Sequence, residues 1–127
     1  MKPKLLFVCV ENSNRSQMAE AFARMQGAEA YSAGSRPSGV VNPKAIAAMK
    51  ERGYDLSQHY SKSLQEIPQE EYDYVVTMGC GDECPFIPAR NREDWELADP
   101  KNLPPHEFSK VRDEIERRVK DLLARAR

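Results

Sequence analysis

The sequence predicts an α/β protein, a three-layer sandwich with a mostly parallel sheet of about four strands and helices on both faces. Apolar segments of strand length alternate with segments of helical spacing, which is typical of βαβ units. The first apolar segment shows no alternation, as in a parallel strand buried on both faces. A chain of 127 residues is long enough for one core, so we expect residues 1–127 to form a single domain.

The N-terminal half alternates strand and helix, and its helices carry recognisable end signals. Gly27 ends the first helix, whose apolar residues recur at helical spacing. Asn42 precedes Pro43, which is an N-cap followed by proline at the first helical position, and Gly53 closes this second helix. The first strand, first helix and second strand are predicted at residues 4–10, 15–26 and 28–34.

The C-terminal half is predicted to add two strands and a long helix. Residues 72–78 are the clearest strand, and a weak fourth strand is expected around residues 95–97. The last helix places apolar residues at intervals of three and four from Phe108 to Ala126. The stretch 57–71 is polar and irregular, so we expect a loop with a short helical turn.

The composition excludes several classes of function. Lysine and arginine total 19 and aspartate and glutamate total 20, so no basic surface for nucleic acid or membrane is indicated. No apolar stretch approaches the length that spans a bilayer. Three cysteines, an odd number, favour a reducing cytoplasm and reactive thiols over a structural disulfide framework. We expect a cytoplasmic monomer.

Cys9 stands between the first strand and the first helix, and five residues separate it from Arg15. Successive backbone N–H groups of such a loop converge on one centre, and the helix adds its positive end, so a tetrahedral oxyanion fits there. These donors favour the thiolate form of Cys9, Arg15 offers a planar fork to two anion oxygens, and Ser16 can donate to the sulfur. The alternative, Cys9 as a small buried apolar residue, leaves Arg15 unexplained. The predicted oxyanion-binding residues are Val10, Glu11, Asn12, Ser13, Asn14 and Arg15.

Cys80 and Cys84 follow the strand 72–78 and therefore lie at the same edge of the sheet as Cys9. As a zinc half-site the pair needs two further ligands, and few candidates exist, so we expect no metal. As structural residues, two cysteines beside two glycines would contribute little to the packing of the core. We favour a redox pair on a mobile loop, because Gly79 and Gly81 tolerate the backbone change that closing a disulfide requires.

Asp99 is the candidate proton donor for the oxygen that leaves. It follows the weak strand, and Pro100 restricts the chain directly after it. Asp-Pro is also an ordinary turn signal, and Asp94 is a competing candidate.

Taken together, these residues resemble the thiol-coupled arsenate reductases built on the low-molecular-weight protein tyrosine phosphatase fold. The resemblance begins with the run from Cys9 to Glu20 and covers nearly the whole chain. It continues through Tyr31–Gly34, Val41–Ala45, Val75–Thr77, Cys84-Pro85, Trp95, Asp99-Pro100 and Val111–Ile115.

The resemblance implies a role for each residue of the loop. Cys9 attacks arsenate, Arg15 holds its oxygens, Ser16 supports the thiolate and Asn12 maintains the shape of the loop. Asp99 protonates the departing oxygen. The implied activity is arsenate detoxification with no tightly bound cofactor.

The resemblance also implies a thiol cascade in which Cys80 and Cys84 pass the oxidation to an external reductant: thioredoxin, glutaredoxin or a low-molecular-weight thiol. Only three residues separate these cysteines, fewer than in well-known thioredoxin-coupled members, which leaves the order of attack open. Some relatives bind a monovalent cation beside the anion loop. Lys62 stands where a carboxylate would help to hold it, so we expect no potassium requirement.

Two alternatives belong to other functional classes. The first is a phosphatase acting on phosphomonoesters, since phosphate and arsenate share shape and charge. Lys101-Asn102 after Asp99-Pro100, in place of an aromatic pair, and Gln17 in place of proline both disfavour it. The second is a redox-sensing or oxyanion-binding protein without catalysis, in which the nucleophile and the acid would be idle.

Overall fold

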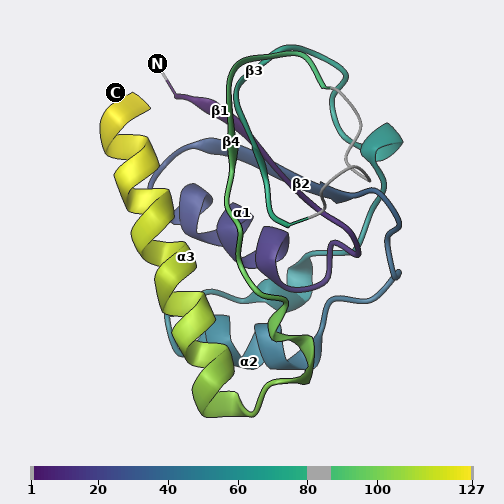
Figure 1. Ribbon diagram of the computed structural model, residues 1–127, viewed down its shortest axis with the longest axis vertical. Helices are drawn as coiled ribbons and strands as arrows, with labels where there is room; N and C mark the ends of the chain where they lie inside the picture. Colours follow the sequence, from purple (N-terminus) through teal and green to yellow (C-terminus); the bar gives the residue numbers. More distant parts are fainter. Residues whose placement is uncertain (1, 80–86, 127) are drawn as a thin grey trace.

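The computed structural model describes residues 2–79 and 87–126 (Figure 1). Strands and helices alternate along most of the chain. The strands are β1 (Lys4–Cys9), β2 (Glu29–Gly34), β3 (Tyr72–Thr77) and β4 (Ala89–Asp94). The α-helices are α1 (Arg15–Met25), α2 (Pro43–Lys50) and α3 (Pro105–Ala126), and the short 3-10 helices are η1 (Leu56–Gln58), η2 (Leu64–Glu66) and η4 (Pro100–Asn102).

The four strands form one parallel sheet in the order β2-β1-β3-β4. The two central strands are the most apolar, and Leu5 to Val8 of β1 have no exposed surface. Because all four strands run the same way, their C-terminal ends meet at one edge, where Cys9 lies. The predicted α/β class and the four-stranded parallel sheet are confirmed.

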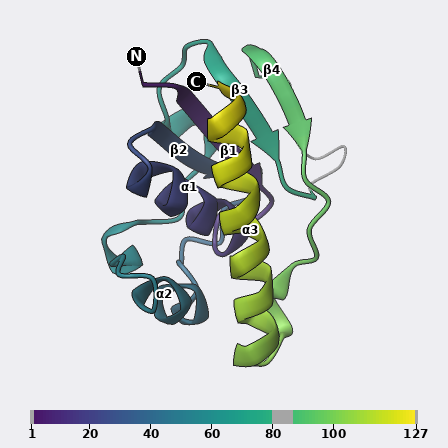
Figure 2. The same ribbon diagram turned by 90° about the vertical axis from the view of Figure 1, so that its left-hand side faces the viewer.

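The two faces of the sheet are covered differently. The helices α1, α2 and α3 all pack on one face, and α1 and α3 lie side by side in Figure 2. The other face is covered, in the described part of the chain, by η2 and the residues that follow it. The first core includes Phe7, Met18, Met49, Val76, Phe108 and Ile115, and the second includes Leu6, Val8, Ile67, Tyr72 and Val75.

Helix α2 begins as the sequence predicts. The side chain of Asn42 accepts a hydrogen bond from the backbone N–H of Lys44 at 2.9 Å, and Pro43 occupies the first turn. The predicted irregular stretch before β3 contains two 3-10 turns, η1 and η2, in place of one. No helix in the described ranges is long and apolar enough to cross a membrane.

The position of the fourth strand was predicted wrongly. We expected it around residues 95–97, but β4 spans Ala89–Asp94 and Trp95 follows it. The strand is polar because it lies at the edge of the sheet, where it pairs only with β3 and exposes most of its side chains. Trp95 continues the ladder by one bond, from its backbone N–H to Thr77 O at 2.8 Å, and packs in the core.

Candidate active site

The loop between β1 and α1 carries the predicted nucleophile at the C-terminal edge of the sheet. The Cys9 side chain is buried, with 2% of its surface exposed. Its sulfur accepts a hydrogen bond from the backbone N–H of Asn12 at 3.2 Å and lies 2.8 Å from Ser16 Oγ. Ser16 Oγ also accepts a hydrogen bond from Asn12 Nδ2 at 2.8 Å, and its hydroxyl can donate to the sulfur. Both contacts stabilise a thiolate.

The loop carbonyl oxygens are bonded to groups outside the loop centre. Cys9 O, Val10 O, Glu11 O and Ser13 O accept from backbone N–H groups of residues 35, 36, 38 and 42, Asn12 O accepts from Gln17 Nε2, and Asn14 O accepts from Met18 N. The C=O and N–H of one trans peptide point in opposite directions. The N–H groups of residues 10–15 therefore point away from these partners, towards the loop centre, which supports the predicted oxyanion-binding set.

Asn12 holds the loop through its side chain and its unusual backbone. Its φ is 52°, in the left-handed region that asparagine tolerates better than most residues. Its side chain is fully buried: Nδ2 also donates to Ser32 Oγ at 3.0 Å, and Oδ1 accepts from Gln17 Nε2 at 2.8 Å and Lys62 N at 3.0 Å. Gly34 lies directly against this loop, where a larger residue would not fit, because a Cβ at position 34 would lie 2.6 Å from Val10 O.

Arg15 is aimed from the first turn of α1 across the edge of the sheet. Its side chain is largely buried, and Nη1 donates to Leu97 O at 2.7 Å. Gly79 makes this possible, because a Cβ at that position would lie 2.8 Å from Nη1. Nη2 is 3.9 Å from Asp99 Oδ2, so Asp99 faces the same centre as Arg15.

Asp99 lies on a short exposed segment tied to its surroundings by two lysines. Its Oδ1 accepts from Lys101 N at 3.0 Å, which orients the carboxyl group. Lys44 of α2 donates to Lys101 O at 3.2 Å and to Leu103 O at 3.1 Å, and Lys101 Nζ pairs with Glu11 at 3.2 Å. The competing candidate, Asp94, accepts from Thr77 Oγ1 at the end of β4.

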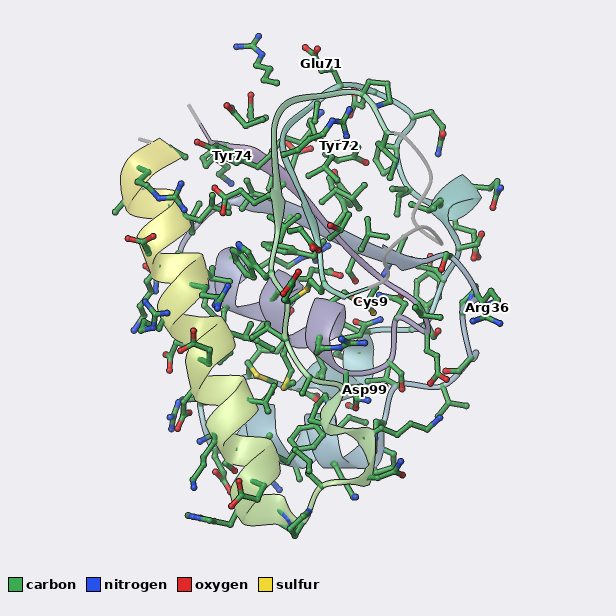
Figure 3. The ribbon with its side chains drawn as sticks, in the orientation of Figure 1. Cys9, Arg36, Glu71, Tyr72, Tyr74 and Asp99 are labelled. Atoms are coloured by element: carbon green, nitrogen blue, oxygen red, sulfur yellow. The ribbon has the colours of Figure 1, made fainter. Side chains whose placement is uncertain are left out.

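These groups surround one cavity of about 210 Å³. Figure 3 places Cys9 and Asp99 in the same part of the molecule, with Arg36 further out on the connection after β2. Larger hollows exist elsewhere, but Cys9 lines this one, so we assign the chemistry here. Its lining is formed by Cys9, Val10, Glu11, Ser13, Asn14, Arg15, Arg36 and Asp99.

Behind the loop, a buried polar network begins at Glu20. Its carboxylate accepts from Ser32 Oγ at 2.5 Å, and Lys62 Nζ lies 3.7 Å from it and 3.4 Å from Tyr60 O. Burial lowers the pKa of the Lys62 ammonium, and the Glu20 carboxylate opposes that shift. The chain thus supplies a positive charge of its own beside the loop.

His59 and Gln17 extend this network. Gln17 Nε2 is a donor to Asn12 and to Tyr60 O, so Gln17 Oε1 accepts from His59 Nδ1 at 2.9 Å. In the neutral imidazole, the other ring nitrogen, Nε2, accepts from Tyr54 OH at 2.6 Å. Burial lowers the pKa of His59, in agreement with this arrangement.

The structure brings together most of the predicted site, and it adds residues that sequence reasoning missed. Cys9, Ser16, Arg15 and Asp99 converge as predicted, whereas Cys80 and Cys84 lie outside the described residues. The missed residues are Glu20, Ser32, Lys44 and Arg36. Glu20 and Ser32 had a usable signal, since each is a polar residue in an otherwise apolar, buried stretch.

The chain matches the family described as low molecular weight phosphotyrosine protein phosphatase over residues 4–127. An arsenate reductase of Staphylococcus aureus (strain bovine RF122 / ET3-1) is 42% identical over 131 residues, covering 98% of each chain. A glutaredoxin arsenate reductase of Synechocystis sp. is 39% identical over 127 residues, covering 96% of this chain and 97% of the other. A solved arsenate reductase in the phosphate binding state superposes with a TM-score of 0.88, at 38% identity over 100% of both chains.

A parallel sheet whose first strand ends at a loop with a buried cysteine and a buried arginine defines the phosphatase-like class. The chain belongs to the low molecular weight phosphotyrosine protein phosphatase family. Within that family it is similar, along nearly its whole length, to proteins named arsenate reductases. The resemblance predicted from the sequence is confirmed.

Proposed function

We propose that this protein reduces arsenate to arsenite. The observation that carries the proposal is the Cys9 sulfur, held inside an anion loop 3.2 Å from Asn12 N, in a chain whose relatives are arsenate reductases. Two further thiols, Cys80 and Cys84, are present in the sequence to receive the oxidation. Residues 1–127 act as a single domain and a monomer in this proposal.

The first step is attack of the Cys9 thiolate on arsenic. The N–H groups of residues 10–15 and the Arg15 guanidinium stabilise the charge on the equatorial oxygens. Asp99 donates its proton to the oxygen opposite the sulfur, which leaves as water. The Arg15–Asp99 distance of 3.9 Å places the acid next to the residue that holds the anion.

The second step transfers two electrons to arsenic. A thiolate from Cys80 or Cys84 attacks the Cys9 sulfur, a disulfide bond forms, and the sulfur–arsenic bond breaks with its electron pair going to arsenic. Arsenic leaves as arsenite. The remaining thiol of the pair then attacks this disulfide, releases Cys9 and leaves Cys80 and Cys84 joined.

An external dithiol protein of the thioredoxin or glutaredoxin type reduces the final disulfide. Two observations support this reductant. The sequence contains Cys80 and Cys84, which can form an exchangeable disulfide, and the Synechocystis relative is named a glutaredoxin arsenate reductase. No tightly bound cofactor is needed, because the electrons come from thiols. A reducing compartment, the cytoplasm, suits this chemistry.

Hydrolysis of phosphomonoesters is the alternative, because the same loop accepts phosphate and the family is named for phosphatases. Among the described residues, the rim beside Asp99 carries the Lys101–Glu11 ion pair, and the cavity lining includes no aromatic side chain that could pack against a phosphotyrosine ring. A low residual phosphatase activity is compatible with the proposal, since its first step is shared.

One comparison tests the proposal. Arsenite release with thioredoxin or glutaredoxin and hydrolysis of an aryl phosphate are measured in wild type, Cys80→Ser and Cys84→Ser. A reductase loses multiple-turnover arsenite release in both variants and keeps any ester hydrolysis. Ester hydrolysis in wild type without arsenite release would overturn the proposal in favour of a phosphatase, and neither reaction would indicate a sensor.

A further inference from the structure

Asn14 has an unusual side chain for the residue that precedes a helix. It occupies the N-cap position of α1, where asparagine normally accepts a hydrogen bond from the first turn, but its side chain makes no capping bond. Only 5% of its surface is exposed. Among the described residues, Asn14 Oδ1 is one of two buried side-chain oxygens without a hydrogen-bond partner.

The position of this oxygen indicates which group supplies its missing hydrogen bond. Asn14 lines the cavity around Cys9, whereas the second such oxygen, Ser35 Oγ, belongs to a residue outside that lining. A buried carbonyl oxygen without a partner costs free energy, so proteins rarely leave one at a site without a ligand that satisfies it. The partner of an acceptor must be a donor. Because Asn14 lines the cavity that receives the anion, we take the donor in the bound state to be a group of the ligand.

The rest of the cradle presents donors. The N–H groups of residues 10–15 and the Arg15 guanidinium all suit bare anion oxygens. Among the acceptors, Glu11 is paired with Lys101, and Asp99 carries a proton when it acts as an acid. A carboxylate would also repel a dianion, whereas the amide oxygen of Asn14 accepts a hydrogen bond without adding charge.

We propose that Asn14 is a specificity residue that accepts a hydrogen bond from a hydroxyl group of the bound oxyanion. Arsenate and phosphate carry such a hydroxyl at neutral pH, whereas sulfate and molybdate are tetrahedral dianions without one. Sulfate is smaller than arsenate and molybdate is larger, so a preference for anions of intermediate size gives the same order in wild type. Only the hydrogen bond predicts that this order depends on the Asn14 side chain, which the variant below tests. In this proposal the site selects protonated oxyanions. The inference deepens the proposed function, because it concerns the anion that Cys9 receives.

The test measures how inorganic phosphate, sulfate and molybdate protect Cys9 from alkylation in the full-length reduced protein at pH 7.5. In wild type, phosphate should protect at a concentration at least tenfold lower than sulfate or molybdate. In Asn14→Ala, half-protection by phosphate should require about 10- to 100-fold more anion, the usual effect of losing one hydrogen bond to a charged ligand. Protection by sulfate and by molybdate should change less than about twofold, because neither anion donates a hydrogen bond.

Asn91→Ala is the matched control, because it removes an exposed asparagine on β4 and should shift none of the three values. Equal weakening of all three anions in Asn14→Ala would overturn the inference and assign the residue to the shape of the loop. Wild-type binding of sulfate or molybdate as tight as that of phosphate would overturn it without any variant. Anion protection does not require turnover, so failure of arsenate reduction with the phosphate preference intact would overturn the proposed function alone.

Discussion

Replacement of Asn12 by alanine should unfold the centre of the anion loop. The change removes four side-chain hydrogen bonds. Three of the partners, Ser16, Ser32 and Gln17, each keep another hydrogen bond in the structure. The backbone N–H of Lys62 loses the acceptor Asn12 Oδ1 in a buried site. An unsatisfied buried N–H costs about 1–3 kcal/mol. A left-handed φ of 52° costs alanine roughly 1 kcal/mol more.

With the void left by the amide, the expected loss is about 3–5 kcal/mol of unfolding free energy, a large part of the ~5–15 kcal/mol of a typical domain. Urea unfolding followed by the fluorescence of Trp95, the single buried tryptophan, measures it. Asn12→Gly tolerates the left-handed backbone, so it should be less destabilising than Asn12→Ala if backbone strain contributes. Asn102→Ala, an exposed control, should change stability by less than about 0.5 kcal/mol. A loss below about 1 kcal/mol in Asn12→Ala would refute this reasoning.

Four further predictions concern the surroundings of the site. Gly34→Ala should abolish protection of Cys9 by phosphate, because the new Cβ lies 2.6 Å from a loop carbonyl oxygen; wild-type protection would contradict this. Burial lowers the pKa of His59 in the folded protein. The neutral imidazole therefore contributes fully to stability above pH 6.5, the ordinary histidine pKa, and this contribution is lost as the pH falls below that value. The unfolding free energy of wild type, measured with urea, should therefore fall by up to about 1.4 kcal/mol per pH unit more than that of His59→Gln between pH 6.5 and 5. The same pH dependence in both proteins would exclude this role. Lys44→Met should lower the kcat for arsenate about tenfold with KM little changed, because Lys44 holds the segment that carries the proposed acid, Asp99. An equal loss of kcat in Lys50→Met, a variant on the same helix, would argue that Lys44 does not position Asp99. Potassium should not raise activity over sodium at fixed ionic strength, because the Lys62 ammonium lies beside the loop; a clear rise would show that this charge does not replace the cation.

The polar β4 shows where sequence reasoning about the fold stops. The burial of β1 was predictable because a strand covered on both faces must be apolar at every position. An edge strand pairs on one side and exposes much of its surface, so its sequence carries no comparable signal. The prediction fell on Trp95 because this residue is apolar; in the structure it is buried but lies just beyond the strand.

The sequence alone determined the loop from Cys9 to Ser16, because the proposed nucleophile, the proposed amide donors and Arg15 follow one another along the chain. It also determined the start of α2, where Asn42 bonds to a residue two positions away. Only the tertiary structure decided the contacts that hold and complete this loop. The bond from Lys62 to Asn12 joins residues fifty positions apart. Only the tertiary structure shows that the Asn14 side-chain oxygen has no hydrogen-bond partner among the described residues, because this depends on every group packed around it and not on local sequence.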